Sequence, residues 1–129
     1  MRFKGFVPQL IIVLLLALSL AACSGAKPED AVLDYLNALV SKDASSLSSL
    51  SCADWEANAL LELDSFQAVT VRLENASCTS AGTEGDAELV QCAGELIATY
   101  NDEDLELELA DRIYKVVEQN GDYLVCGYK

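Results

Sequence analysis

Histidine is absent from this chain of 129 residues, and basic residues are few: eight lysines and arginines stand against 21 aspartates and glutamates, giving a net charge of −13. Without histidine, Ser-His-Asp and Cys-His catalysis are excluded, and the commonest protein ligand of zinc, copper and non-haem iron is missing. So few cations cannot form the basic face that phosphate binding requires, which excludes nucleic acid as a partner. We expect no metal ion and no cofactor.

A dense block of hydrophobic residues lies within the first 22 residues. Arg2 and Lys4 precede the apolar core of this block, and small residues follow it. This order predicts an export signal peptide over residues 1–22. A retained membrane helix is the alternative, but the uninterrupted apolar run is shorter than the roughly 20 residues that a helix needs to cross a bilayer.

The segment Leu20-Ala21-Ala22-Cys23 resembles the bacterial lipoprotein box. The resemblance implies that signal peptidase II cuts before Cys23 and that this cysteine carries two or three acyl chains, palmitate among them. Such lipidation is enough for stable anchoring to a membrane. Ser24 follows in place of aspartate, which in the resembled lipoproteins favours the outer membrane where a cell has two. An ordinary secretory signal with a chance cysteine is the alternative.

The expected mature protein consists of the lipidated cysteine with a short tether, residues 23–27, and a single domain, residues 28–129. The four residues between Cys23 and Pro28 span about 14 Å at most, so the domain is expected close to the bilayer. Residues 1–22 contain two basic residues and no acid, so their removal takes the net charge from −13 to −15.

The other four cysteines form an even set in an exported domain, which predicts two disulfides. Three connectivities are open, and we favour Cys78 with Cys92, across a hairpin, and Cys52 with Cys126, which ties the helical part to the last strand. A zinc site of four thiolates is the alternative. Successive cysteines have 25, 13 and 33 residues between them, so no Cys-x-x-Cys pair occurs, which argues against zinc.

The first half of the domain has the periodicity of helices. Pro28 suits the start of a helix, and Glu29 and Asp30 complement the positive end of its dipole. Asp43 is expected to cap a second, short helix, and residues 55–63 to form a third. An apolar stripe at steps of three and four runs along the first helix through Val32, Tyr35, Leu36, Leu39 and Val40.

After Asp64 the spacing of apolar residues changes to 2, which predicts strands. Residues 69–73 alternate, and the glycine-containing segment 79–86 predicts a turn. A strand of about 13 residues then ends at Tyr100. Its expected inward-facing residues are Val90, Cys92, Gly94, Leu96, Ala98 and Tyr100.

A turn at residues 101–104 leads to a further alternating run, in which Leu105, Leu107 and Leu109 share one face. This run becomes irregular at residues 110–112 and then continues as the same strand. Asn120-Gly121 predicts a hairpin turn before the last strand. Helices followed by about four antiparallel strands predict an α+β fold, in which the helices pack on a curved, cup-shaped sheet.

This order resembles the nuclear transport factor 2-like, or cystatin-like, fold, and in particular small bacterial lipoproteins that carry such a domain. The resemblance rests on the helix over residues 29–40 followed by Lys42-Asp43, on the long central strands, and on the ending over residues 116–126. It covers nearly all of residues 28–128.

The resemblance implies a cup, and the fold includes isomerases and dehydratases whose cups hold a tyrosine with acidic residues. The corresponding candidate pocket comprises Tyr35, Tyr100, Asp111 and Tyr114. If buried, Asp111 could act as a general base. Alternatively, a bulge at residues 110–112 turns Asp111 to solvent, where it would pair with Arg72 or Arg112.

The expected function is that of a non-enzymatic, lipid-anchored module on the outside of the bacterial membrane, which binds or assists an unidentified protein or small molecule of the cell envelope. Two alternatives stay open. One is an isomerase- or dehydratase-like enzyme that uses the cup. The other is a homodimeric interaction protein that uses the open face of its sheet.

Overall fold

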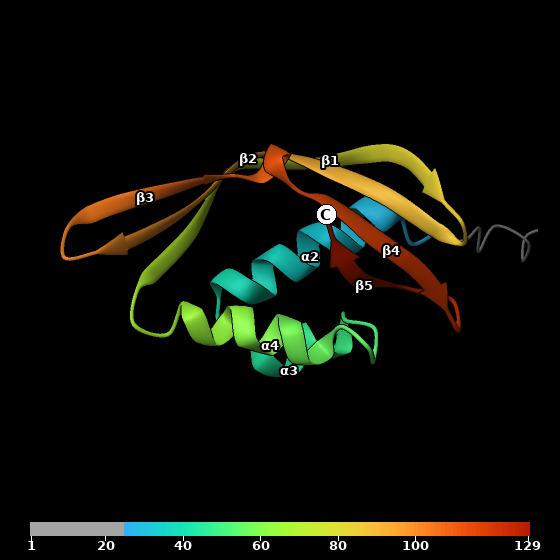
Figure 1. Cartoon of the computed structure of the whole chain (residues 1–129), viewed down its shortest axis with the longest axis horizontal. Coiled ribbons are helices and arrows are strands. Elements are labelled where there is room, and N and C mark those ends of the chain that lie inside the picture. The colour runs from blue at the N-terminus through green and yellow to red at the C-terminus, as the bar shows by residue number, and fades with distance from the viewer. Residues whose placement is uncertain (1–24) are drawn as a thin grey trace, which may run out of the picture.

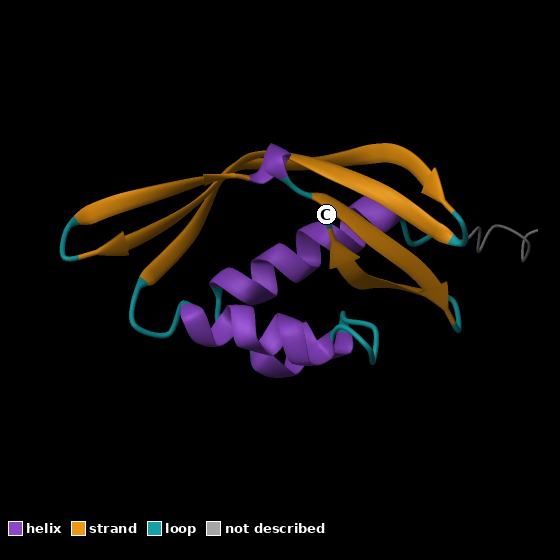
Figure 2. Ribbon diagram, viewed as in Figure 1, coloured by secondary structure: helices purple, strands orange, loops and turns teal. Residues whose placement is uncertain are grey.

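The computed structural model describes residues 25–129, so the predicted signal peptide and Cys23 lie outside the described part. These residues form an α+β fold in which three helices precede a five-stranded antiparallel sheet that is not closed (Figures 1 and 2). Among the helices of residues 25–129, none has both the length and the apolar character to cross a membrane.

The three predicted helices are confirmed as α2 (Pro28–Val40), α3 (Ala44–Ser49) and α4 (Glu56–Ser65). In α2 the apolar stripe is turned inward, and Tyr35, Leu36 and Leu39 are completely buried. Asp43 caps α3 as expected, because its Oδ1 accepts a hydrogen bond from the backbone N–H of Ser46 at 3.1 Å.

The longest pairing in the sheet joins β1 (Thr70–Glu84) to β2 (Ala87–Tyr100). The predicted turn over residues 79–86 is therefore wrong in extent, since only Gly85-Asp86 forms it. The earlier glycine, Gly82, produces a shift of register after Ser80 and does not end the strand. A β-bulge absorbs an extra residue while pairing continues on both sides, which the sequence pattern alone does not distinguish from a turn.

The run expected to form one strand after residue 104 is divided into β3 (Glu103–Glu108), a single 3₁₀ turn, η1 (Leu109–Asp111), and β4 (Ile113–Gln119). Both strands pair with β2, β3 near its end and β4 near its start. The expected irregularity at residues 110–112 is thus a change of direction that creates a fifth strand. The last strand, β5 (Asp122–Tyr128), pairs with β4.

The core lies between the helices and the face of the sheet that curves over them (Figure 1). Two disulfides are formed: Cys78–Cys92 links directly paired residues of β1 and β2, and Cys52–Cys126 links the segment before α4 to β5. These are the pairs favoured from the sequence. The fully buried larger side chains are Tyr35, Tyr114, Leu36, Leu39, Leu47, Ile97, Val32, Val90, Val116 and Val125.

The hairpin of β2 and β3 extends beyond the helices (Figure 2). Leu105 pairs with the buried Ala98, yet it is 60% exposed, and Tyr100 is exposed to the same extent. The expectation that both side chains face a covered core is therefore wrong. Alternation predicts correctly which face they occupy, but it does not tell where the helices end.

Candidate binding groove

The structure does not assemble the pocket expected from the sequence. Tyr35 and Tyr114 meet in the core, with ring centroids 6.2 Å apart in an edge-to-face arrangement. Tyr100 lies exposed at the end of β2, and Asp111 is exposed in η1. Only the two buried tyrosines come together, and Asp111, the candidate general base of the enzyme alternative, does not join them.

Asp111 does not form the expected ion pair with either arginine. Arg72 bonds to Glu74 at 3.3 Å and to Asp104 at 3.4 Å. The guanidinium of Arg112 donates to Glu62, with 2.6 Å between Nη1 and Oε1. Solvent exposure of Asp111 agrees with the alternative that a local irregularity turns it outward, but the proposed partners are wrong.

The interior of the curved sheet is occupied by protein side chains. Tyr35 and Tyr114 are both 0% exposed, and the Tyr35 hydroxyl accepts a hydrogen bond from Nε1 of Trp55 at 3.1 Å. Burial raises the pKa of both tyrosines, because it disfavours the charged phenolate. At neutral pH both are therefore uncharged parts of the core and poor proton acceptors.

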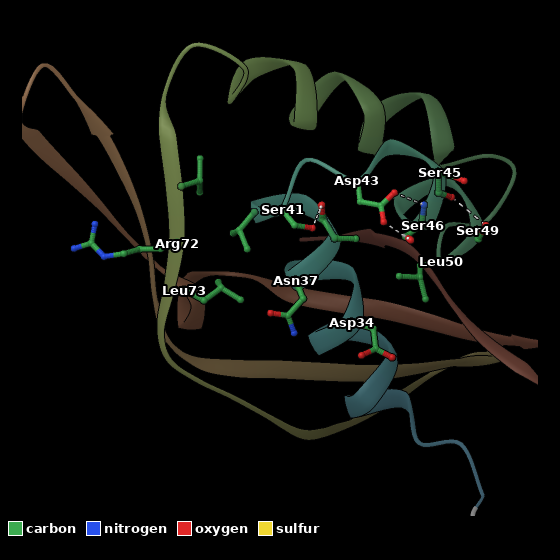
Figure 3. A pocket seen from close by; sticks show the side chains of 13 residues that line it. Asp34, Asn37, Ser41, Asp43, Ser45, Ser46, Ser49, Leu50, Arg72 and Leu73 are labelled. Carbon is green, nitrogen blue, oxygen red and sulfur yellow. Dashed lines mark hydrogen bonds between the residues drawn. The ribbon is translucent and has the colours of Figure 1, made fainter.

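A groove of about 830 Å³ lies between α2, α3 and β1 (Figure 3). This size falls in the range of pockets that hold small molecules or peptide segments. Its polar lining comprises Asp34, Asn37, Ser41, Asp43, Ser45, Ser46, Ser49 and Arg72, and its apolar lining comprises Ala38, Val40, Leu50, Val71 and Leu73.

Helix geometry explains why one side of the groove is polar. Asp34, Asn37 and Ser41 recur at steps of three and four, so they share a face of α2 beside its buried apolar stripe. Following the apolar stripe alone misses this site. The spacing of the polar residues was the available signal.

The charges on this lining are mostly negative. Asp43 is held ionised at the start of α3, because hydrogen bonds from the hydroxyl and the backbone of Ser46 lower its pKa. Asp34 forms no ion pair within residues 25–129. Arg72 points away from the other lining side chains (Figure 3), towards its partners Glu74 and Asp104.

One end of the groove is fixed by Lys42, which directly follows Ser41. Its Nζ donates a hydrogen bond to the backbone oxygen of Val69 at 2.6 Å. This contact ties the end of α2 to the start of β1, so the two walls of the groove hold a defined relation to each other.

A half-buried ion pair, also missed from the sequence, joins α4 to the residue that directly precedes β4. The Arg112 side chain is 30% exposed and that of Glu62 only 12%, and the guanidinium lies 4.2 Å from the ring centroid of Tyr128. The sequence indicates only that Glu62 lies three residues after Ala59 and therefore shares the buried face of α4. The pair joins residues 50 positions apart, a separation over which a single sequence carries no pairing signal.

Three large apolar residues within residues 25–129 are exposed, at two separate smaller cavities. Leu61 of α4 borders the cavity that Glu62 and Arg112 line, whereas Tyr100 and Leu105 of the β2–β3 hairpin border the other. We call Tyr100 and Leu105 the hairpin patch. No known protein-family profile and no curated protein matches the chain.

Proposed function

We propose that this protein is a lipid-anchored, extracytoplasmic binding module of the bacterial cell envelope, with a nuclear transport factor 2-like, cup-shaped domain. Acyl chains on Cys23 hold the domain at the membrane, and the groove between α2, α3 and β1 receives the partner. The module carries out no chemistry of its own.

The observation that carries this proposal is the filled interior of the sheet. Tyr35 and Tyr114 occupy the place where an enzyme with a cup-shaped fold would bind its substrate, and both are completely buried. The groove instead lies outside the core, between α2, α3 and β1. Its lining offers hydroxyls, an amide and carboxylates over an apolar floor, which suits recognition better than bond making.

Site-directed photo-crosslinking in intact cells tests the groove. A benzoylphenylalanine at position 37, inside the groove, should form a defined adduct, because a bound partner would lie against that side chain. The same photo-reactive residue at position 118, exposed on β4, is the matched control. The same adducts from both positions, or no adduct from position 37, would contradict a partner in the groove.

The hairpin patch favours a second candidate function, self-association. Large apolar side chains gathered at one end of a molecule often mark an interaction surface. In this reading two copies bury their patches against each other, as a homodimer. The groove and the patch lie on different elements, so the two functions are separable by mutation.

Analytical ultracentrifugation of the detergent-solubilised protein tests the second candidate. We expect dimers that dissociate when Leu105→Asp introduces a charge into the patch, whereas Glu106→Gln, on the other face of the same strand, should leave them intact. A protein that stays monomeric at high concentration would remove self-association as a function.

A further inference from the structure

The groove contains an open sheet edge. In the strand order, β1 is terminal, and it pairs with β2 alone among the described strands. Val71, Arg72 and Leu73 of this strand line the groove. A terminal strand presents unpaired N–H and C=O groups, and an added strand can bond to them.

The hairpin turn determines which groups face outward. The turn between β2 and β3 is Asn101-Asp102, and both residues have positive φ, as a two-residue hairpin turn requires. The flanking pair Tyr100–Glu103 then closes the turn by exchanging hydrogen bonds. From that pair on, alternate residues of β2 bond to β3, and those between them bond to β1.

Ala98 and Leu96 therefore bond to β3, whereas Thr99 and Ile97 bond to β1. The partners of the latter two are Thr70 and Arg72, which turn their backbone groups towards β2. Val71 and Leu73 accordingly point theirs to the open edge.

The position of Lys42 supports the same register independently. It reaches from the end of α2 to the backbone oxygen of Val69, so that oxygen faces away from β2. Val69 is two residues before Val71, and residues two apart in a strand point their backbone groups to the same side. The N–H and C=O groups of Val71 and Leu73 thus lie along the side of β1 that faces α2.

We propose that the groove binds an extended, basic polypeptide segment that adds as a strand to the open edge of β1. This inference rests on the proposed function and specifies its partner. Backbone hydrogen bonds to Val71 and Leu73 would supply affinity, and the lining side chains would supply selectivity.

The charges of the groove decide the chemistry of this partner. Asp34 and Asp43 line the cavity, and Arg72 is directed away from it. A lysine or arginine of the segment can lie along the apolar floor and place its charged group at these carboxylates. A second copy of this chain would instead bring a molecule of net charge −13 to an acidic groove, and like charges disfavour that pairing.

Fluorescence anisotropy with synthetic peptides tests the inference. The probe is a labelled nine-residue peptide of alternating valine and lysine, added to the lipidated protein in nonionic detergent. A peptide of alternating valine and glutamate is the charge control. We expect the lysine peptide to bind, binding to weaken with salt, and the glutamate peptide not to bind.

Two N-methylated versions of the lysine peptide test strand addition itself. In an extended peptide all valine N–H groups lie along one edge and all lysine N–H groups along the other. Methylating the edge that faces β1 should abolish binding, whereas methylating the other edge should preserve it. Equal binding of both versions, or equal binding of the lysine and glutamate peptides, would overturn the inference.

A variant of the protein tests the role of charge at the groove. Asp34→Asn should weaken the affinity for the lysine peptide by up to about fivefold, which is the effect of losing one exposed ion pair. Asp64→Asn, an exposed aspartate of α4 outside the groove, is the matched control and should bind as the unchanged protein does.

The crosslinking experiment separates this inference from the proposed function. A defined partner adduct at position 37, with no binding of any peptide, would leave the binding module standing and overturn strand addition by a basic segment. An adduct between two copies of the chain at position 37 would overturn the inference in favour of self-pairing.

Discussion

At the scale of single residues, Gly94 shows how the absence of a side chain allows two strands to approach closely. Its φ is +98°, and a Cβ built on it would lie 2.5 Å from the backbone oxygen of Glu74 and 2.6 Å from that of Asn75. Those two carbonyls belong to the bulge at which β1 shifts register against β2. Only a residue without a side chain permits that close approach of two strands.

Gly94→Ala should therefore destabilise the protein by on the order of 3 kcal/mol, because strain and backbone clash add. Gly85→Ala is the matched control: its φ is also positive, at +62°, but a Cβ at that position would meet nothing within 4 Å. The control should cost only about 1 kcal/mol. Urea unfolding measures both, and equal losses would contradict the importance of close approach at the bulge.

Glu95 shows electrostatic strain on the solvent face of the sheet. It pairs with Glu74 on one side and with Glu108 on the other, and repulsion, chiefly from Glu106, raises its pKa. The folded state therefore holds the proton more tightly than the unfolded state does. The free energy of unfolding should therefore fall as the pH rises from the ordinary pKa of glutamate through the raised pKa of Glu95 in the folded state.

Glu95→Gln should consequently raise the urea midpoint at neutral pH, since it removes one charge from the cluster. The gain should vanish at acidic pH, where the carboxyl of Glu95 is protonated in both states. Glu118→Gln is the control, because Glu118 pairs with Tyr123 across the sheet rather than with another glutamate. A gain for Glu95→Gln that persists at acidic pH would show that charge repulsion is not its cause.

Residue roles set by local chemistry could be predicted from the sequence, whereas those set by distant contacts could not. Asp43 caps the helix that begins at the next residue, and its bond to Ser46 spans only three positions, so its role is visible in the sequence. The pairing of Glu62 with Arg112 depends on how α4 lies against the sheet. No local pattern carries that information.

At the scale of elements, the two disulfides close loops of different length. Cys52–Cys126 spans 74 residues and Cys78–Cys92 spans 14. A cross-link restricts the unfolded chain more when its loop is longer. The longer bridge also ties the helical half of the domain to β5, whereas the shorter one joins strands that are already paired.

Replacing Cys52 and Cys126 by serine should cost about 4 kcal/mol, and replacing Cys78 and Cys92 about 3 kcal/mol. Guanidinium unfolding of the two double variants gives both values, each variant serving as the control for the other. The reverse order would mean that strand pairing, rather than the restricted unfolded chain, dominates the contribution of the bridges.

Element boundaries can be predicted well where caps and periodicity agree. Pro28 and Asp43 correctly mark where α2 and α3 begin. The prediction fails at residues 79–86 and after residue 108, because a glycine bulge, a turn and a 3₁₀ segment interrupt alternation in similar ways. The groove depends on how α2 lies against β1, and a residue pattern does not contain that relation.

At the scale of the whole molecule, the α+β class could be predicted from the order of helices and strands, but the number of strands could not.

The described chain begins beside the turn between β4 and β5, where Lys27 and Asp122 line the same cavity. The β2–β3 hairpin lies at the opposite end of the molecule (Figure 1). A lipid on Cys23 would therefore leave the hairpin patch directed away from the membrane.

The proposed location also gives the strong negative charge a physical consequence. Without residues 1–22 the net charge would be −15. Membrane surfaces rich in anionic lipid repel such a domain. Stable attachment to the membrane then depends on the acyl chains of Cys23 rather than on the surface of the protein.

The intact mass of the protein extracted from its own membranes is the most direct test of acylation at Cys23. We expect a chain that begins at Cys23 and is heavier than residues 23–129 by a diacylglycerol group, with or without a further acyl chain. An unmodified thiol at Cys23, or a chain that still carries residues 1–22, would contradict it.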